Sequence, residues 1–502
     1  MDYTPFPPDE TRQAFDSGLS EIHTSSSAPQ RGVAFTYLPA SHAKALKPDT
    51  TIVEGIRGAG KSFWWAALHS AKHREFLSST FVEASDLANI RTSQGFGNDS
   101  NPDNAPKKDV LTHLTKTSEP RNIWKATLAT QLDFPAPFPQ GDWAKKVQWV
   151  AEYPEEYERL LYSKHSQLKE EGKKHIILFD ALDRLAGDWK GIRPLAKALF
   201  QLALDMRSFH HIRLKLFVRP DMLEDKEIMS FPDASKLFGE KVSLQWNKLD
   251  LFALLYQCIG NADKGAEAFR NHCKTEFHLD WEQTDEVWVI PKHLRTNETS
   301  QKAVFHAIAG DKMGAGQNKG YPYTWLLSHL LDGRNQVSPR SFIAALKKAA
   351  DYTSSPEKNA LYYRGIQEGV QEASRIRVGE IVEDYPWVEQ VAQPLRGLIV
   401  PCNPNEIINI WEQSSILETL RNSTEDDNAK LLPQHLNEGY EGILKDLKGL
   451  GVITQQGKIQ INPRLFDPDE AGITTQQSKI QVPDVYRVGF GMGRKGGVRP
   501  LA

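Results

Sequence analysis

Residues 51–65 read TIVEGIRGAGKSFWW, a short apolar segment followed by a glycine-rich turn and an apolar run. Positions 55–62 fit the spacing G-x-x-x-x-G-K-S/T. Glycines allow the backbone to curve closely, so that its N–H groups point at one anion. A helix beginning near Lys61 presents the positive end of its dipole to the same anion. The stretch therefore predicts a phosphate-binding loop between a strand and a helix.

Each side chain of this loop has its own expected role in binding a nucleotide. Lys61 is expected to reach the β- and γ-phosphates, and Ser62 to give an oxygen to Mg²⁺. We therefore predict ATP and Mg²⁺ as cofactors. The predicted nucleotide-binding residues of the loop are Gly55, Arg57, Gly58, Ala59, Gly60, Lys61 and Ser62.

A second motif, HIILFDALDRL, occupies residues 175–185. Its continuous apolar run is typical of a strand buried on both faces, and the run ends at Asp180. A carboxylate in that place suits a magnesium shell, so Ser62 and Asp180 are the predicted metal ligands. Asp183 either polarises the attacking water or caps the next helix. We predict Asp180 and Asp183 as catalytic residues.

Two arginines are candidates for contact with the nucleotide. Arg219 follows the apolar segment LKLFV and is predicted to contact the γ-phosphate as a third catalytic residue, the alternative being a surface ion pair. Arg340 lies in the first turn of a helix predicted over 338–352, with Ser338 as its cap and Pro339 in that turn. A cation there opposes the helix dipole. We therefore expect Arg340 to have an anionic partner, either the nucleotide or a carboxylate.

Strands expected at 51–54, 79–83, 175–179, 212–218 and 242–246 alternate with helices. That alternation predicts an α/β fold with a parallel sheet and right-handed crossovers. The expected domains are a peripheral segment at 1–33, a P-loop core at 34–248 with a helical insertion at about 86–172, a helical lid at 249–354, a helical and winged-helix-like domain at 355–466, and a hairpin with a basic tail at 467–502.

The last third of the chain suggests a winged-helix domain. A helix over 438–450 ends at Gly451, and a hairpin over 452–461 follows. The segment GVITQQGKIQI at 451–461 is echoed by GITTQQSKIQV at 472–482, which we interpret as two similar hairpin pieces. The tail from Arg487 to Arg499 is basic and glycine-rich, and is either solvated or a phosphate contact through Arg494 and Lys495.

The composition sets limits on the class of protein. The chain has 502 residues, 40% of them hydrophobic and 25% charged, and a net charge of −3, which predicts about three folded domains and excludes a disordered chain. Three scattered cysteines without a CxxC pair argue against a disulfide framework or a structural zinc site. With no signal peptide and no long apolar run, we expect a cytoplasmic protein without membrane contact.

The segments GIRGAGKS, LFDALDRL and LFVRP together resemble the STAND and KAP families of P-loop NTPases, within the wider AAA+-like group. STAND members carry two acidic positions around a small residue, and a sensing strand that ends in Arg-Pro, as at Asp180, Asp183, Arg219 and Pro220. The KAP pattern has two adjacent acidic residues before Leu-Asp-Arg, whereas this chain has Ala181 at the second. A lid followed by a winged helix also resembles the initiator and loader branch of AAA+ proteins.

The resemblance implies an ATP-dependent switch that forms a homo-oligomer or controls a protein effector. By analogy, the setting is prokaryotic defence against phage. The main alternative is a DNA-binding ATPase of the initiator or loader type that uses the winged helix and the basic tail. A scaffold that binds ATP without hydrolysing it, which Ala181 makes conceivable, and a kinase are further alternatives.

Overall fold

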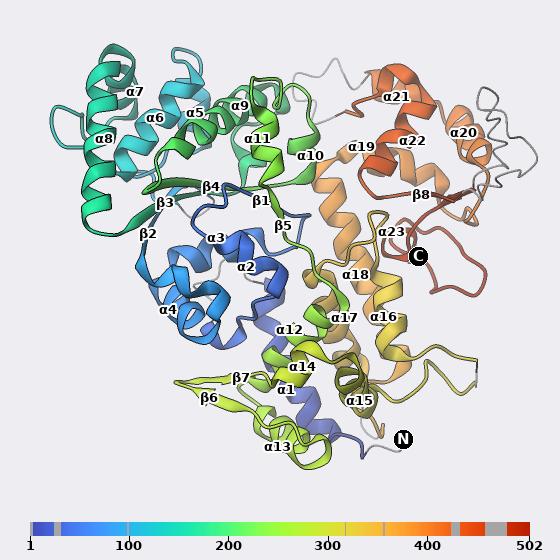
Figure 1. Cartoon of the computed structure of the whole chain (residues 1–502). Coiled ribbons are helices and arrows are strands. Elements are labelled where there is room, and N and C mark those ends of the chain that lie inside the picture. Colours follow the sequence, from blue (N-terminus) through green and yellow to red (C-terminus); the bar gives the residue numbers. More distant parts are fainter. Residues whose placement is uncertain are drawn as a thin grey trace, which may run out of the picture. The chain divides into compact units, whose positions relative to one another are not determined.

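The computed structural model describes residues 4–24, 32–97, 100–316, 318–354, 357–422, 432–456 and 479–501 (Figure 1). Contacts divide the chain into two compact units, each described here by itself. The sheet unit comprises Thr24–Trp246 and Glu282–Ile290. The helical unit comprises Met1–His23, Asn247–Trp281 and Pro291–Ala502. None of the described helices combines the length and the apolar composition that a bilayer span requires.

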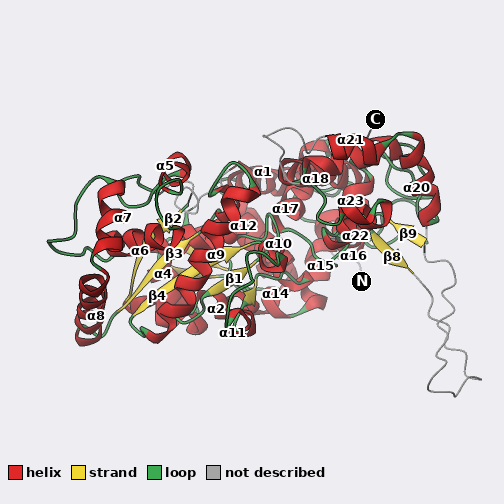
Figure 2. Cartoon of the chain, turned by 90° about the horizontal axis from the view of Figure 1, so that it is seen from above, coloured by secondary structure: helices red, strands yellow, loops and turns green. Residues whose placement is uncertain are grey.

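A five-stranded sheet forms the centre of the sheet unit. Its strands, in the spatial order β2-β3-β4-β1-β5, are all parallel. Figure 2 shows β2, β3, β4 and β1 side by side in yellow. Since all five run the same way, their carboxyl ends meet at one edge, and the predicted α/β fold with a parallel sheet is confirmed. The strands are β1 (Ile52–Glu54), β2 (Ile90–Phe96), β3 (Lys174–Phe179), β4 (Ile212–Val218) and β5 (Val242–Ser243).

Helices cover both faces of this sheet because successive strand residues point to opposite faces. Ile52, Ile177 and Leu216 belong to one core, which the inserted helices and α9 (Trp189–Asp205) complete. Val53 and Ile176 belong to the other. The helices of that second core are α2 (Ala40–Leu46), α3 (Lys61–His69) and α4 (Ala71–Thr80).

The second strand was predicted in the wrong place. Residues 79–83 form the end of α4 and the start of the 3-10 helix η3 (Val82–Asn89), because Phe76, Leu77 and Phe81 continue a helical apolar pattern. The actual strand β2 lies at the start of the stretch predicted as the helical insertion at about 86–172. Its sequence, IRTSQGF, is mostly polar because β2 is an edge strand that is only partly buried.

The predicted insertion therefore begins after β2. Its helices are α5 (Lys108–Leu114), α6 (Pro120–Gln131), α7 (Trp143–Glu152) and α8 (Pro154–Glu170). Helices α7 and α8 are separated at Tyr153, because Pro154 has no N–H to continue the ladder and instead begins α8. The short helices of the sheet unit after β3 are η4 (Leu182–Arg184), η5 (Met206–Ser208), α10 (Pro220–Glu224) and α11 (Ala234–Gly239).

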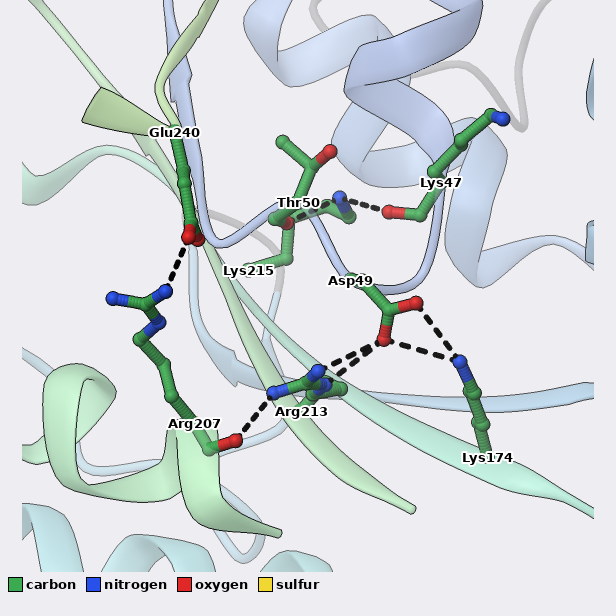
Figure 3. Close-up of polar contacts among 8 residues, drawn as sticks. All are labelled: Lys47, Asp49, Thr50, Lys174, Arg207, Arg213, Lys215 and Glu240. Atoms are coloured by element: carbon green, nitrogen blue, oxygen red, sulfur yellow. Dashed lines mark hydrogen bonds and ion pairs between the residues drawn. The ribbon is translucent and has the colours of Figure 1, made fainter. Parts of the chain in front are cut away.

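Charged residues of β3 and β4 form hydrogen bonds with the segment before β1 (Figure 3). Lys215 in β4 is fully buried, and its Nζ donates to the carbonyl oxygens of Ala45 (2.7 Å), Lys47 (2.9 Å) and Thr50 (2.6 Å). Asp49 accepts hydrogen bonds from Lys174 at 3.0 Å and from the guanidinium of Arg213. These contacts hold the α2–β1 connection against β3 and β4.

Lys215→Met is expected to lower the free energy of unfolding by about 2–4 kcal/mol, because three carbonyl groups, two of them buried, lose their donor. Burial lowers the pKa of Lys215 to about 7, against 10.5 for an ordinary lysine. Between these two values the folded protein binds fewer protons than the unfolded chain, so Lys215 makes stability rise with pH in that window. Urea unfolding of both proteins from pH 7 to 10 should show this slope in the wild type and its loss in the variant.

The amino-terminal segment is not peripheral as predicted. Helix α1 (Pro8–Thr24) belongs to the helical unit, where Phe6, Phe15 and Leu19 are fully buried. The ring of Phe6 stacks on that of Phe269 at 5.1 Å. Phe15 and Leu19 are one helical turn apart, a short apolar stripe that the many polar residues around it conceal in the sequence.

Helices make up most of the remaining helical unit. Gly369 lets α17 and α18 pack closely, since a Cβ there would lie 2.1 Å from the carbonyl oxygen of Ala345. The predicted domain boundary at 354–355 thus falls between two tightly packed helices. A hairpin of β6 (Glu282–Thr284) and β7 (Val287–Val289) interrupts the series and belongs to the sheet unit. The helices are α12 (Lys248–Gly260), α13 (Ala266–Phe277), α14 (Lys292–Thr296), α15 (Glu298–Ala309), α16 (Pro322–Leu330), α17 (Pro339–Tyr352) and α18 (Tyr363–Asp384).

The chain ends in the predicted winged-helix-like arrangement, in which helices precede a two-stranded antiparallel sheet around one apolar core. β8 pairs with β9, which lies in the second copy of the repeat. The expected partner at 459–461 is outside the described residues, and the predicted boundary at 466–467 divides this strand pair. The elements are α19 (Pro386–Ala392), α20 (Pro404–Gln413), α21 (Ile416–Asn422), α22 (Tyr440–Gly449), β8 (Thr454–Gln456), β9 (Lys479–Gln481) and α23 (Asp484–Arg487).

The predicted basic tail is largely part of the core. Arg487 is fully buried, and it donates to Asp484 at 2.6 Å and to the carbonyl oxygens of Met492 and Val498 at 3.0 Å. The expectation of a solvated tail is therefore wrong for this residue. Arg494 and Lys495 are exposed, as predicted for a phosphate contact, although Arg494 also lies 3.7 Å from Asp484.

Candidate nucleotide-binding site

Three neighbouring strands bring the predicted site residues of the sheet unit to one edge. The glycine-rich loop follows β1, Arg219 follows β4, and Asp180 follows β3. β4 pairs with both β1 and β3, so the three carboxyl ends are adjacent. In open parallel sheets, ligands bind outside the carboxyl ends of the strands.

The backbone of the loop requires glycine at several points. Gly58 and Gly60 have φ values of +78° and +101°, in the region that other residues rarely adopt. A Cβ at Gly55 would lie 3.2 Å from both Ala59 Cβ and Lys61 Cγ, which is tighter than ordinary contact. Gly60 is the N-cap of α3, and the first N–H groups of that helix have no acceptor within it. The loop can therefore present backbone donors to an anion.

Lys61 folds back over this loop. Its Nζ donates to the carbonyl oxygens of Gly55 at 2.7 Å and Ile56 at 3.0 Å. Burial lowers the pKa of Lys61, whereas the negative charge of Asp180 raises it. An ammonium group has three N–H donors, and these two carbonyls accept two of them. The third donor fits a phosphate oxygen.

Asp180 is only 4% exposed and lies beside Ser62. Burial raises the pKa of Asp180, opposed first by a side-chain hydrogen bond with Ser62 and then by the charge of Lys61. The Asp180 N–H also donates to the carbonyl oxygen of Phe96 at 3.0 Å, which fixes the end of β3 against β2. Two hard oxygen atoms side by side fit Mg²⁺, which commonly takes one or two protein ligands and completes its shell with phosphates and water.

Ala181 turns the chain sharply after Asp180. Its φ of +56° is unusual for a residue with a side chain and is the kind of local strain that occurs at functional sites. The turn leads into η4, which brings Asp183 Oδ2 to 3.4 Å from Arg219 Nη1. Asp183 does not cap the next helix, because Asp188 does so by accepting from the N–H of Gly191 at 2.7 Å. The capping alternative for Asp183 is therefore wrong.

Arg219 is 7% exposed and forms ion pairs with Asp221 and Asp183, so the ion pair of the alternative is present but the surface location is wrong. Its Nε donates to Asp221 Oδ1 at 3.0 Å and its Nη2 to Asp221 Oδ2 at 2.8 Å. Asp221 was not predicted as a site residue. The only signal for it in the sequence is an acidic residue two positions after Arg219 in the first turn of a helix.

Comparisons with known proteins give limited similarity. No protein-family model and no curated protein matches the chain. Solved structures similar to it include the Aeropyrum pernix ORC1 protein in complex with DNA, at 16% identity, 96% and 95% coverage of this chain and that one, and a TM-score of 0.32. The A. pernix ORC2 protein in ADPNP–ADP complexes has 13% identity, 90% and 93% coverage and a TM-score of 0.30. Cdc6p from Pyrobaculum aerophilum has 12% identity, 93% coverage of both chains and a TM-score of 0.28.

TM-scores this low support no inference about the function of this chain. The resemblance to the STAND and KAP families stays a prediction, carried by the three motifs alone.

Aromatic residues contact the loop on the side of α2. Trp246 Nε1 donates to the carbonyl oxygen of Ala59 at 2.8 Å, and the ring of His42 meets that of Trp246 edge-on at 5.0 Å. His42 Nδ1 accepts from Trp64 Nε1 at 3.1 Å, and its Nε2 lies 3.2 Å from the Gln245 carbonyl oxygen. Burial lowers the pKa of His42 to about 3, so this ring is neutral and can both donate and accept.

Trp246→Phe is expected to raise the Kd for ATP by about 3- to 10-fold, because the loop loses one hydrogen bond at Ala59. Calorimetric titration with ATP and Mg²⁺ measures this effect. Tyr162→Phe, which alters an exposed ring on α8, is the matched control and should bind ATP as the wild type does. Equal affinity in the Trp246 variant would show that the hydrogen bond from Trp246 to Ala59 does not contribute to nucleotide binding.

Arg340 has a carboxylate partner. It belongs to the helical unit, where its Nη1 donates to Glu380 of α18 at 2.7 Å. Glu380 also contacts the buried Arg377, which pairs with Asp332 at 3.3 Å. Of the two partners considered for Arg340, the structure thus favours the carboxylate over the nucleotide. Ser338 lies at the predicted N-cap of α17, but its side chain makes no capping hydrogen bond.

Proposed function

We propose that this chain binds ATP together with Mg²⁺ and hydrolyses it, and that it acts as a nucleotide-dependent switch. The observation that carries the proposal is the convergence of Lys61, the Ser62–Asp180 pair and the Arg219–Asp183 pair at the ends of three adjacent strands. Phosphoryl transfer depends chiefly on positioning and on stabilising charge, and these side chains suit both tasks.

The proposed mechanism assigns a task to each group. The N–H groups of the loop and the third donor of Lys61 bind the phosphates. Ser62 and Asp180 would hold Mg²⁺, which would neutralise charge on the phosphate oxygens. Asp183 orients the attacking water and takes its proton as the water attacks the terminal phosphate and ADP leaves, and Arg219 stabilises the negative charge that develops on the transferred phosphate.

Release of inorganic phosphate from ATP by the purified chain tests this proposal. We expect phosphate release with Mg²⁺ and none in excess EDTA. ATP binding with no release in Mg²⁺ would instead indicate a scaffold that keeps ATP without hydrolysing it.

The proposed output of the switch is assembly with further copies or control of a protein effector. The support is the resemblance of the three motifs to the STAND and KAP families, which also suggests defence against phage. The chain also contains a second compact unit, the helical unit, and we propose that this unit transmits the exchange of ATP for ADP to the partner.

A DNA-binding ATPase of the initiator or loader type is the second candidate. The winged-helix-like arrangement favours it, together with the exposed Arg494, Lys495 and Arg499. Fluorescence anisotropy with duplex DNA over a salt series distinguishes the two candidates. DNA binding that weakens steeply with salt, with faster turnover on DNA, would favour the second candidate. Neither effect is expected of a switch that acts on protein partners.

A further inference from the structure

Asp221 holds the guanidinium of Arg219 along one edge. The two hydrogen bonds, at 3.0 Å and 2.8 Å, form a bidentate pair whose side chains are only 9% and 16% exposed. Pairs of this kind fix the plane of the guanidinium as well as its position. Asp221 also lies in the first turn of α10, where the helix dipole stabilises a carboxylate.

The remaining terminal nitrogen of Arg219 faces Asp183. The distance from Nη1 to Asp183 Oδ2 is 3.4 Å, longer than either hydrogen bond to Asp221. The charges of Asp180, Arg219, Asp183 and Asp221 all act on Lys61, so these groups surround one site. A phosphate bound beside Lys61 would therefore compete with Asp183 for Nη1, while the two shorter hydrogen bonds to Asp221 are kept.

We propose that Asp221 is a positioning residue that makes Arg219 offer Nη1 to the terminal phosphate of a nucleoside triphosphate, and that Asp183 gives up this contact when the triphosphate binds. The inference rests on the proposed function. A diphosphate lacks the third phosphate and leaves Nη1 with Asp183. Asp221 thus sets the preference for ATP over ADP and has little effect on the affinity for nucleotides in general.

Asp221→Asn in the full chain tests the proposal. The amide keeps the shape of the side chain but has one acceptor oxygen, so it cannot hold both N–H groups of Arg219. We expect the Kd for a non-hydrolysable ATP analogue with Mg²⁺ to rise about tenfold, the size of one charge-assisted hydrogen bond. The Kd for ADP should stay within about twofold. Retained ADP binding also reports that the site is folded.

A double-mutant cycle asks whether Asp221 acts through Arg219. Arg219→Gln should weaken binding of the analogue, and adding Asp221→Asn to it should change the Kd by no more than about twofold. Asp233→Asn is the control, since Asp233 pairs with Lys236 on an exposed surface. Both Kd values should be those of the wild type in this control.

Two results would overturn the proposal: an unchanged ratio of the two Kd values in Asp221→Asn, whether or not both affinities fall, or additive effects in the cycle. An equal loss would make Asp221 a general support of the fold. A wild-type chain that binds neither nucleotide would refute the proposed function itself. Wild-type binding of both nucleotides, with the ratio unchanged in the variant, would refute only the role of Asp221.

Discussion

Lys61→Ala is expected to raise the Kd for ATP by about a hundredfold or more, the largest effect of any single substitution in the site. The substitution removes the third ammonium donor and the positive charge that faces the phosphates. It also removes the charge that offsets the burial of Asp180, so that this carboxylate is less stable in its ionised form. A metal ligand must be ionised, so Mg²⁺ binding is weakened as well.

Calorimetry with ATP and Mg²⁺ measures the effect of Lys61→Ala. Lys72→Ala removes an exposed lysine of α4 in the same unit and is the matched control. The control should bind ATP as the wild type does. Near-wild-type affinity in the Lys61 variant would mean that the loop is not the nucleotide site.

Asp183→Asn is expected to lower kcat for ATP hydrolysis by about 10²- to 10³-fold, within the range for loss of a general base. Asparagine keeps an acceptor oxygen for Arg219, so ATP affinity should change little. A fall in kcat without a rise in KM is the signature of a group that acts in the transition state. Phosphate release at saturating ATP measures kcat directly.

Asp188→Asn provides the comparison for Asp183→Asn. Asp188 caps α9, and asparagine caps helices equally well, so this variant should keep the kcat of the wild type. Unchanged turnover in the Asp183 variant would contradict the catalytic assignment. The comparison also bears on Ala181, which stands where the KAP pattern has an acidic residue. The turn at Ala181 brings Asp183 to Arg219, so Asp183 is the acidic residue of this motif whose catalytic role the variant tests.

The parts of the site that depend on local sequence could be predicted. The loop from Gly55 to Ser62 and the strand that ends at Asp180 are encoded in short runs of residues, and the structure has both at the expected places. Arg219 could be placed at the end of its strand in the same way. Its partner could not, because the pair with Asp221 depends on the side-chain geometry of a turn, which an acidic residue in the sequence does not reveal.

Elements whose stability comes from distant contacts were missed. The polar edge strand β2 is stabilised by pairing with β3, about eighty residues away along the chain. Helix α1 buries Ala14, Phe15 and Leu19, an apolar stripe too short to stand out from a polar segment. Arg487 is basic in sequence yet buried in the fold, since one carboxylate and two carbonyl groups accept its hydrogen bonds. Composition alone describes such a residue as part of a solvated tail.

Turnover of ATP by the purified chain with Mg²⁺, wild type beside Lys61→Ala, tests the central claim most directly. We predict that the wild type releases inorganic phosphate and that the variant does not. A wild-type chain that neither binds nor hydrolyses ATP, or a variant that hydrolyses it as fast as the wild type, would contradict the account.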